Sequence, residues 1–243
     1  MTINNLEQFS NEFRTLLKEN TGIPDLFKNG SEMLSQLVLS ENWFQEILAK
    51  LLLDEEFYKS QLYSIDKNEI QLYRSPDKLF TIRAYIWDPK LIYPIHDHGS
   101  WSIIASHINE IRERKFIRLD DKSDENFGIL KQIDDKKLLP GYTTVVLPID
   151  DGIHQMESLN NKSAVSIHVY GNPIRKGFIR NYDINSNSIK YVYSPFINKK
   201  IDAIKTIGNF REPWSEEILI NTFNSTKNEI IKKECMISLD EMK

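Results

Sequence analysis

Between about Leu79 and Tyr193 the chain consists of short strand-like segments separated by turn residues. The segments are rich in β-branched and aromatic residues and nearly alternate in polarity, as in LFTIRAYIW, WSIIASHI and AVSIHVYG. Pro and Gly cluster between them, in DPKLIYP, LLPGY and YGNP, and no helical pattern intervenes. Short strands joined by turns in this way indicate an antiparallel sandwich or a small antiparallel barrel.

Helical patterns flank this β region. Apolar residues recur at three- and four-residue steps from Leu6 to Leu17, and TGIPDLFKNG then breaks the pattern with Gly and Pro. A second helical zone runs over about residues 31–60, and the tail becomes helical again at Pro213, a residue favoured at helix starts. We therefore expect one mainly β domain with three regions: an N-terminal helical layer (1–78), a barrel (79–199) and a helical C-terminal extension (200–243).

Composition excludes several classes of function. The 31 basic and 35 acidic residues give a formal net charge of −4, and no basic stripe favours a nucleic-acid partner. The single cysteine, Cys235, allows no internal disulfide and fits a reducing compartment. The N-terminus lacks a signal-peptide pattern, and no apolar run approaches the ~20 residues of a membrane span. We expect a cytoplasmic protein with no membrane partner, either a monomer or a small homo-oligomer.

Two of the five histidines lie two positions apart in YPIHDHGSW. The two-residue period of a strand places His96 and His98 on one side and Asp97 on the other, and two such imidazoles can bind one metal ion. His154, after the Gly-containing turn of PIDDGIHQMES, is the candidate third ligand. His107, in IIASHIN, is interpreted as a surface or turn histidine that takes no part in metal binding.

The segment SIHVYG places Ser166, His168 and Tyr170 at alternate positions of one strand, hence on one face. They could simply be polar residues of a core strand, each in need of a hydrogen-bond partner. Three polar side chains facing one way into a small barrel form an unusual core. A relay in which each residue satisfies the next fits the pattern better.

The HDH motif, the Pro and Gly turns and the single His154 together resemble the two-part signature of the cupin superfamily, whose fold is a double-stranded β-helix. In that family a Glu often follows the second histidine by four or five residues. Those positions here are Ser102 and Ile103, so a carboxylate ligand is missing. Three histidines followed by a Ser-His-Tyr strand resemble the cysteine dioxygenase-like group, bacterial thiol dioxygenases in particular. The resemblance covers about half of the chain, from about Trp87 to YVYSPFIN.

This resemblance implies an Fe(II)-dependent dioxygenase that uses O2 to oxidise a small thiol, such as cysteine or 3-mercaptopropionate, to a sulfinate. Three neutral imidazoles would leave about half of an octahedral shell open for a thiolate and dioxygen. In the family relay, Tyr170 would donate a hydrogen bond to bound oxygen or substrate, His168 would orient Tyr170, and Ser166 would orient His168. The same histidines could hold Zn(II) or Ni(II), and iron follows from the resemblance alone.

The sequence departs from the family at two positions. Ile103 stands where mammalian-type enzymes have a cysteine cross-linked to the tyrosine. The family's substrate-carboxylate position aligns without gaps on Glu69, which suits an amine or guanidinium instead. A small gap would bring Arg74 into this position. Arg83 is another candidate partner for a carboxylate, although it could equally lie on a solvent face at the barrel mouth.

Family position also places Trp101 and Met156 in the cavity, with plain barrel core as the alternative for both. Two other functions remain open on the same scaffold. The first is a non-thiol cupin oxygenase that acts on an amine-bearing substrate, as Glu69 suggests. The second is a non-catalytic metal-binding cupin whose C-terminal helices form a partner surface.

Overall fold

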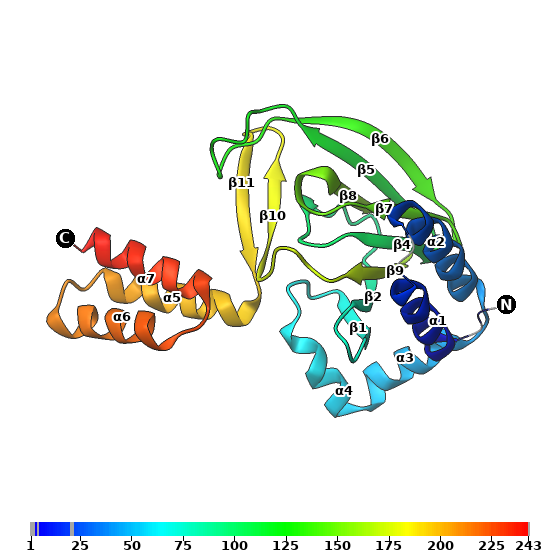
Figure 1. Ribbon diagram of the computed structural model, residues 1–243, viewed down its shortest axis with the longest axis horizontal. Coiled ribbons are helices and arrows are strands. Elements are labelled where there is room, and N and C mark those ends of the chain that lie inside the picture. Colours follow the sequence, from blue (N-terminus) through cyan, green and yellow to red (C-terminus); the bar gives the residue numbers. More distant parts are fainter. Residues whose placement is uncertain (1–2, 4, 20–21, 243) are drawn as a thin grey trace. The chain divides into compact units, whose positions relative to one another are not determined.

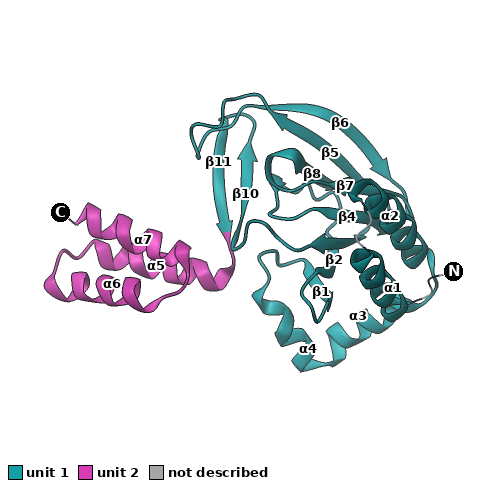
Figure 2. Ribbon diagram, in the orientation of Figure 1, with its two compact units in different colours: residues 1–192 teal, residues 193–243 magenta. Residues whose placement is uncertain are grey.

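The computed structural model of the protein describes residues 3, 5–19 and 22–242 (Figure 1). The chain divides into two compact units, Met1–Val192 and Tyr193–Lys243, coloured separately in Figure 2. The first unit contains the β-sheets and the N-terminal helices, and the second consists mainly of helices.

The strands of the first unit form two antiparallel sheets. Their bounds are β1 Glu69–Arg74, β2 Phe80–Trp87, β3 Ile95–Asp97, β4 Ser102–Ile108, β5 Ile111–Arg118, β6 Leu130–Leu138, β7 Thr143–Val146, β8 Ile153–Ser158, β9 Ala164–Gly171, β10 Phe178–Asp183 and β11 Ser188–Tyr193. One sheet has the order β1-β2-β9-β4-β7 and the other β11-β10-β3-β8-β5-β6. This arrangement, with helices before and after it in the sequence, confirms the predicted mainly β fold class with antiparallel sheets.

The central strand β9 of the five-stranded sheet is buried on both faces, which explains why AVSIHVYG carries polar residues at alternate positions. Every residue of β9 is buried. Ile167 and Val169 belong to the apolar cluster formed with the N-terminal helices, whereas Tyr170 belongs to the cluster between the sheets. Since strand side chains alternate, Ser166 and His168 face the barrel interior together with Tyr170.

The N-terminal helices cover the outer face of this sheet (Figure 1). They are α1 Leu6–Lys18, α2 Ile23–Leu39, α3 Trp43–Leu53, α4 Glu55–Ser60 and the 3₁₀ turn η1 Gln61–Tyr63. Phe13 of α1 anchors the layer, because its ring packs 5.4 Å from that of Phe9 and 5.0 Å from that of Phe80 on β2.

The helix expected to begin near residue 31 begins instead at Ile23. Pro24 does not break it, since it lies in the first turn, where the missing N–H would have no helical partner. Gly30 is retained inside the helix for close packing: a Cβ there would lie 2.6 Å from Ile103 Cδ1 and 2.9 Å from Phe13 Cε2. Of the segment TGIPDLFKNG, Gly22 lies before the helix and residues 23–30 lie inside it, so the predicted break ends at Gly22 and not at Gly30.

Element changes do not coincide with the expected region boundaries at 78/79 and 199/200. Strand β1 begins at Glu69, inside the range given to the helical layer, and helix α5 begins at Pro195. Strands β6 and β10 were also not anticipated. In β6 only the two end residues are buried, and β10 is mostly half-buried, so neither has the apolar pattern by which strands are recognised.

The second unit has its own apolar core. It contains α5 Pro195–Gly208, α6 Pro213–Ser225 and α7 Glu229–Glu241. Its fully buried members include Leu219 and Cys235. The predicted helix start at Pro213 is confirmed, and Glu212 with Ser215 forms a capping box there. Over the part of the chain that the structure describes, none of the helices combines the length and apolar character that crossing a membrane requires.

We expect Phe13→Ala to lower the free energy of unfolding of the first unit by about 3–5 kcal/mol, because it empties a fully buried aromatic site. Leu52→Ala, on helix α3 at a side chain that is 81% exposed, is the matched control and should change it by less than about 0.5 kcal/mol. Urea denaturation followed by circular dichroism measures both. Equal effects would show that the helices do not pack on the sheet as described.

Candidate metal centre

Strands β3 and β8 bring two distant histidines together. His96 on β3 pairs directly with His154 on β8 in antiparallel register. His98 follows β3, which ends at Asp97, so it lies on the turn and not in the strand as expected. All three imidazoles are buried, His154 to 1% exposure.

The three rings converge on one point. One ring nitrogen from each of His96, His98 and His154 lies within 4.8 Å of the other two. The Nε2 atoms of His98 and His154 are 3.0 Å apart. Two nitrogens that are each about 2.1 Å from one ion, at right angles, are also about 3.0 Å apart. The spacing therefore fits adjacent ligands of a single metal ion.

Hydrogen bonds to the outer ring nitrogens set the tautomers. His96 Nδ1 lies 3.0 Å from the Pro94 carbonyl oxygen, and His154 Nδ1 lies 2.9 Å from Glu113 Oε1. Both Nδ1 atoms donate, because a carbonyl oxygen and a carboxylate only accept. The Nε2 atoms of these two residues therefore carry lone pairs, as metal ligands must.

Glu113 on β5 is buried beneath His154 and was not anticipated. It also accepts from Thr144 Oγ1 at 2.6 Å, and Lys115 Nζ lies 3.7 Å away. Burial raises the pKa of Glu113, against the charge of Lys115 and the hydrogen bond from Thr144. The alternation of strand β5 turns Glu113 inward, although charged residues flank it in the sequence.

His98 differs from the other two. Within the described residues, its buried Nδ1 has no hydrogen-bond partner. Its proton is therefore placed on Nε2, where it donates to His154 Nε2, and a bound cation would take the place of that proton. Burial lowers the pKa of all three imidazoles, most strongly for His98 and His154, so they are neutral near pH 7.

The residue between the two histidines fixes the turn. Asp97 is fully buried and accepts hydrogen bonds from Arg175, Arg180 and Tyr182. Burial acts to raise its pKa, but the two guanidinium groups lower the pKa of Asp97 to about 2. A Cβ on Gly99 would lie 1.8 Å from the Arg175 carbonyl oxygen, so only glycine permits this approach of the two loops.

The predicted relay strand forms one continuous hydrogen-bonded chain. Ser166 Oγ lies 2.7 Å from His168 Nε2, and His168 Nδ1 lies 3.0 Å from the Tyr170 hydroxyl. Trp87 Nε1 donates to Ser166 Oγ at 2.8 Å, and the Tyr170 hydroxyl donates to the Tyr85 hydroxyl at 3.3 Å. The ring centroid of Tyr170 is 5.2 Å from that of His98, which places the chain beside the histidine group.

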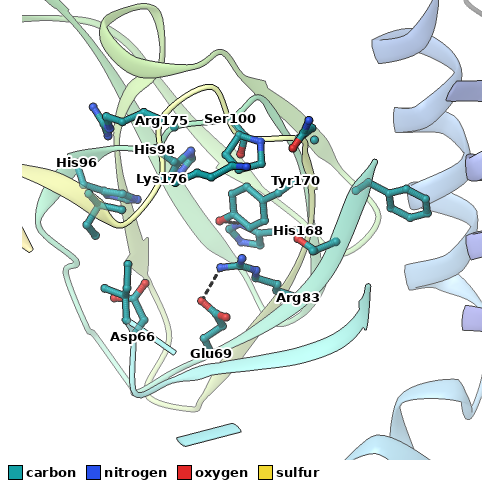
Figure 3. A pocket seen from close by; sticks show the side chains of 18 of the residues that line it. Asp66, Glu69, Arg83, His96, His98, Ser100, His168, Tyr170, Arg175 and Lys176 are labelled. Atoms are coloured by element: carbon teal, nitrogen blue, oxygen red, sulfur yellow. Dashed lines mark hydrogen bonds and ion pairs between the residues drawn. The ribbon is translucent and has the colours of Figure 1, made fainter. Parts of the chain in front are cut away.

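The chain continues into an ion pair. The Tyr85 hydroxyl donates to Glu69 Oε2 at 3.1 Å, and Arg83 Nη1 donates to the same oxygen at 3.0 Å. Ser64 Oγ donates to Glu69 Oε1 at 3.0 Å. Figure 3 shows Arg83 and Glu69 in the pocket, with Tyr170 and His168 next to Arg83.

These residues border a cavity of about 640 Å³. Its wall includes His96, His98, His168, Tyr170, Arg83, Glu69, Arg74, Met156, Tyr93 and Asp66. Four of the five predicted substrate-binding residues therefore meet at one cavity, and Arg83 is about one third exposed there. Tyr93 and Asp66, which are hydrogen-bonded to each other, were not anticipated.

Trp101 does not line the cavity. Its ring packs 5.7 Å from Phe27 and 6.5 Å from Phe13, in the cluster under the helices. Ile103 belongs to the same cluster, whereas Ile104 faces the interior. The expected position was wrong because alternation along this segment turns odd-numbered residues outward.

Ser102 and His107 also have defined positions. Ser102 pairs with Tyr170 across β4 and β9, and within the described residues its buried Oγ has no partner. His107 lies apart from the other histidines. Its Nδ1 contacts the Val38 carbonyl oxygen at 2.8 Å, and its ring packs against Trp43 and Phe44. His107 therefore lies outside the histidine group, as expected, but it is half-buried in strand β4 and is not a surface or turn residue.

Comparison with known proteins gives likeness of fold only. No protein-family model matches the chain. The Cupin 2 conserved barrel domain protein of Salinispora arenicola is 13% identical, with a TM-score of 0.33 over 45% of this chain and 80% of that one. The DMSP lyase DddQ of Ruegeria pomeroyi is 12% identical, with a TM-score of 0.29 over 40% of this chain and 41% of that one. The capsular polysaccharide assembling protein CapF of Staphylococcus aureus is 17% identical, with a TM-score of 0.34 over 54% of this chain and 34% of that one.

The chain thus spans less than half of the length of the DMSP lyase and of CapF. The antiparallel sheets bring together a buried three-histidine group that could hold a metal ion. Imidazole ligands suit iron, zinc and nickel alike, so the histidines alone leave the metal open.

Replacing His96, His98 or His154 with Ala should remove bound metal, because two remaining imidazoles hold a divalent ion weakly. His107→Ala is the matched control and should retain the metal content of the wild type, since this histidine lies outside the group. Elemental analysis of the purified, metal-loaded variants measures the difference. If His154→Ala keeps its full metal content, the three-histidine assignment is wrong.

Glu113→Gln should weaken metal affinity by about tenfold or more while the three ligands remain, since the carboxylate orients His154 and raises its basicity. Competition with a chromogenic chelator measures the affinity. Arg112, the neighbour of Glu113 on β5, points outward to Asp135, so Arg112→Gln provides a control that should leave the affinity unchanged. Equal affinities in all three proteins would contradict a supporting role for Glu113.

Proposed function

We propose that this protein is a non-haem iron thiol dioxygenase that converts a small thiol, such as cysteine or 3-mercaptopropionate, to a sulfinate. The observation that carries the proposal is a buried three-histidine group beside the tyrosine of a Ser-His-Tyr relay. Within the described residues, the group contains no carboxylate. Three neutral ligands leave the charge of a divalent ion uncompensated, which favours an anionic thiolate as a further ligand.

The reaction balances without another reductant. A thiolate and O2 give a sulfinate: two sulfur–oxygen bonds form, the oxygen–oxygen bond breaks, and the four electrons lost by sulfur reduce dioxygen. Iron, held by His96, His98 and His154, would supply the site at which thiolate and dioxygen meet. The residues around it would bind and orient the substrate and exclude bulk water.

The relay would position the hydroxyl of Tyr170 at this site. Because an indole N–H only donates, Trp87 leaves the proton of Ser166 free to donate to His168 Nε2. His168 then carries its proton on Nδ1 and donates to the Tyr170 oxygen. Because the Tyr170 oxygen accepts the hydrogen bond from His168, the Tyr170 hydroxyl can donate its own hydrogen bond to a ligand next to His98.

Two cations are candidates for holding a substrate carboxylate. Arg83 lies on the cavity wall, but it is paired with Glu69. Arg74 lines the same cavity, and among the described residues no carboxylate forms an ion pair with it within 4.0 Å. Arg74 is therefore the better candidate for a carboxylate-bearing thiol.

The alternative, an oxygenase for an amine-bearing substrate, rested on Glu69. This carboxylate already accepts hydrogen bonds from Arg83, Tyr85 and Ser64. A substrate ammonium group would have to displace one of these protein donors, so the arrangement favours the thiol. A non-catalytic metal-binding cupin would show tight metal binding without oxygen consumption.

We expect the iron-loaded protein to consume oxygen with at least one thiol in a panel that includes cysteine, 3-mercaptopropionate and cysteamine. An oxygen electrode measures uptake, and mass spectrometry identifies the sulfinate. Alanine and a polyamine, which lack sulfur, are the control compounds. Uptake with none of the thiols would refute the proposed activity, and uptake with the amines alone would select the alternative.

Tyr170→Phe should retain iron and lower turnover with the active thiol by about 10²-fold, as is typical of a lost positioned donor. The matched control is Tyr73→Phe, because Tyr73 packs against Phe80 under the helices and does not line the cavity. Steady-state oxygen uptake at known iron content measures both variants. Undiminished turnover in Tyr170→Phe would exclude the hydroxyl from the reaction.

A further inference from the structure

The hydrogen-bonded chain beside the histidines continues beyond the Ser-His-Tyr relay to Tyr85 and Glu69. This extension determines to which group the Tyr170 hydroxyl donates in the free protein. Trp87 at one end can only donate, and the Glu69 carboxylate at the other end can only accept. Between them, the Tyr85 hydroxyl donates to Glu69 Oε2 and therefore presents a lone pair to Tyr170. In the free protein, the Tyr170 proton points to Tyr85 and away from the cavity space beside His98.

We infer that Tyr85, held by Glu69, is a positioning residue. Its hydroxyl accepts the hydrogen bond of the Tyr170 hydroxyl in the free protein, and it loses that bond when Tyr170 donates instead to an anion bound at the metal. This inference rests on the metal site of the proposed function, but not on the identity of the substrate. Tyr85 is suited to the task because it is buried, its ring lies 4.5 Å from that of His168, and its hydroxyl contacts both Glu69 and Tyr170.

The bond that must be given up is a weak one. The two tyrosine oxygens are 3.3 Å apart, whereas O–H···O hydrogen bonds are usually about 2.7–2.8 Å long. By contrast, the Ser166 and His168 contacts, at 2.7 and 3.0 Å, are of ordinary length. An incoming anion therefore competes only with the long Tyr170–Tyr85 bond, while His168 keeps donating to the Tyr170 oxygen.

The charged neighbours support the same direction. Arg83 donates a hydrogen bond to Glu69 Oε2, the same oxygen that accepts from the Tyr85 hydroxyl. The guanidinium carbon of Arg83 lies 5.1 Å from the centroid of the Tyr170 ring. Ser64 donates to the second oxygen of Glu69. With three donors directed at it, Glu69 remains an acceptor, and Tyr85 cannot reverse its hydrogen bond without leaving a buried carboxylate oxygen less well satisfied.

The test uses azide as the anion and cobalt(II) as the metal, because the visible spectrum of cobalt reports anion binding without turnover. Wild-type protein, Tyr85→Phe, Tyr170→Phe and the double variant are loaded with cobalt and titrated with azide. Without Tyr85 as a competing acceptor, the Tyr170 proton is free for the anion. Tyr85→Phe should therefore bind azide roughly three- to tenfold more tightly than the wild type, the factor expected for one net hydrogen bond.

The double variant shows whether the gain passes through Tyr170. Tyr170→Phe should weaken azide binding, and adding Tyr85→Phe to it should then change nothing. Tyr73→Phe removes a hydroxyl outside the cavity and should match the wild type. The inference is overturned if Tyr85→Phe leaves azide affinity unchanged or weaker, if the gain persists without Tyr170, or if the protein takes up no cobalt.

A second measurement needs no variant. In zinc-loaded protein with ¹⁵N-labelled histidine, the nitrogen chemical shifts should show His168 protonated on Nδ1 and bare on Nε2. A proton on Nε2 would reverse the chain and overturn the inference even if Tyr85→Phe failed to fold. Failure of the thiol screen alongside the expected azide pattern would remove the dioxygenase proposal and leave this inference standing.

Discussion

The direct pairing of β3 with β8 is the contact on which the site depends. It places His96 opposite His154, although the two lie in separate segments of the chain. A three-residue strand has few backbone bonds of its own, so other contacts must hold it. Arg175 and Arg180 do so through the buried carboxylate of Asp97, on the side of β3 away from the histidines. Thus the middle residue of HDH anchors the turn from which His98 reaches the metal position.

The interior of the barrel shows how polar side chains can occupy a core. Ser166, His168 and Tyr170 alternate with apolar residues that pack under the helices, so one strand serves two environments. Each of these three polar groups is hydrogen-bonded to the next, and the hydrogen-bonded chain ends on a donor, Trp87, at one side and on an acceptor, Glu69, at the other. Such a network is well ordered only when complete, because a missing member leaves a buried polar group unsatisfied.

The sequence was informative where local periodicity determines the outcome. Alternation was sufficient to recognise β9 and to place its three polar residues on one face, and turn residues were sufficient to indicate an antiparallel barrel. It was uninformative where the structure depends on contacts between distant segments. Nothing local marks Glu113 as the partner of His154, or Arg175 and Arg180 as partners of Asp97, since these pairs form only when separate strands meet. Trp101 packs under the helices and not in the cavity, because the alternation of side chains along this segment determines its side of the sheet.

The ion pair of Arg83 with Glu69 also limits what the cavity can select. An arginine in a partly closed cavity would attract an anion if it stood alone, and a glutamate would attract an amine. Paired, they cancel most of each other's long-range attraction, and the guanidinium and carboxylate act mainly as hydrogen-bonding groups. Selection by charge then passes to the three neutral imidazoles, which would leave a bound divalent cation uncompensated, and to Arg74 on the cavity wall, which has no ion-pair partner within 4.0 Å among the described residues. Both favour an anionic ligand, so the thiol substrate that we propose would suit this cavity better with a carboxylate than with an amine alone.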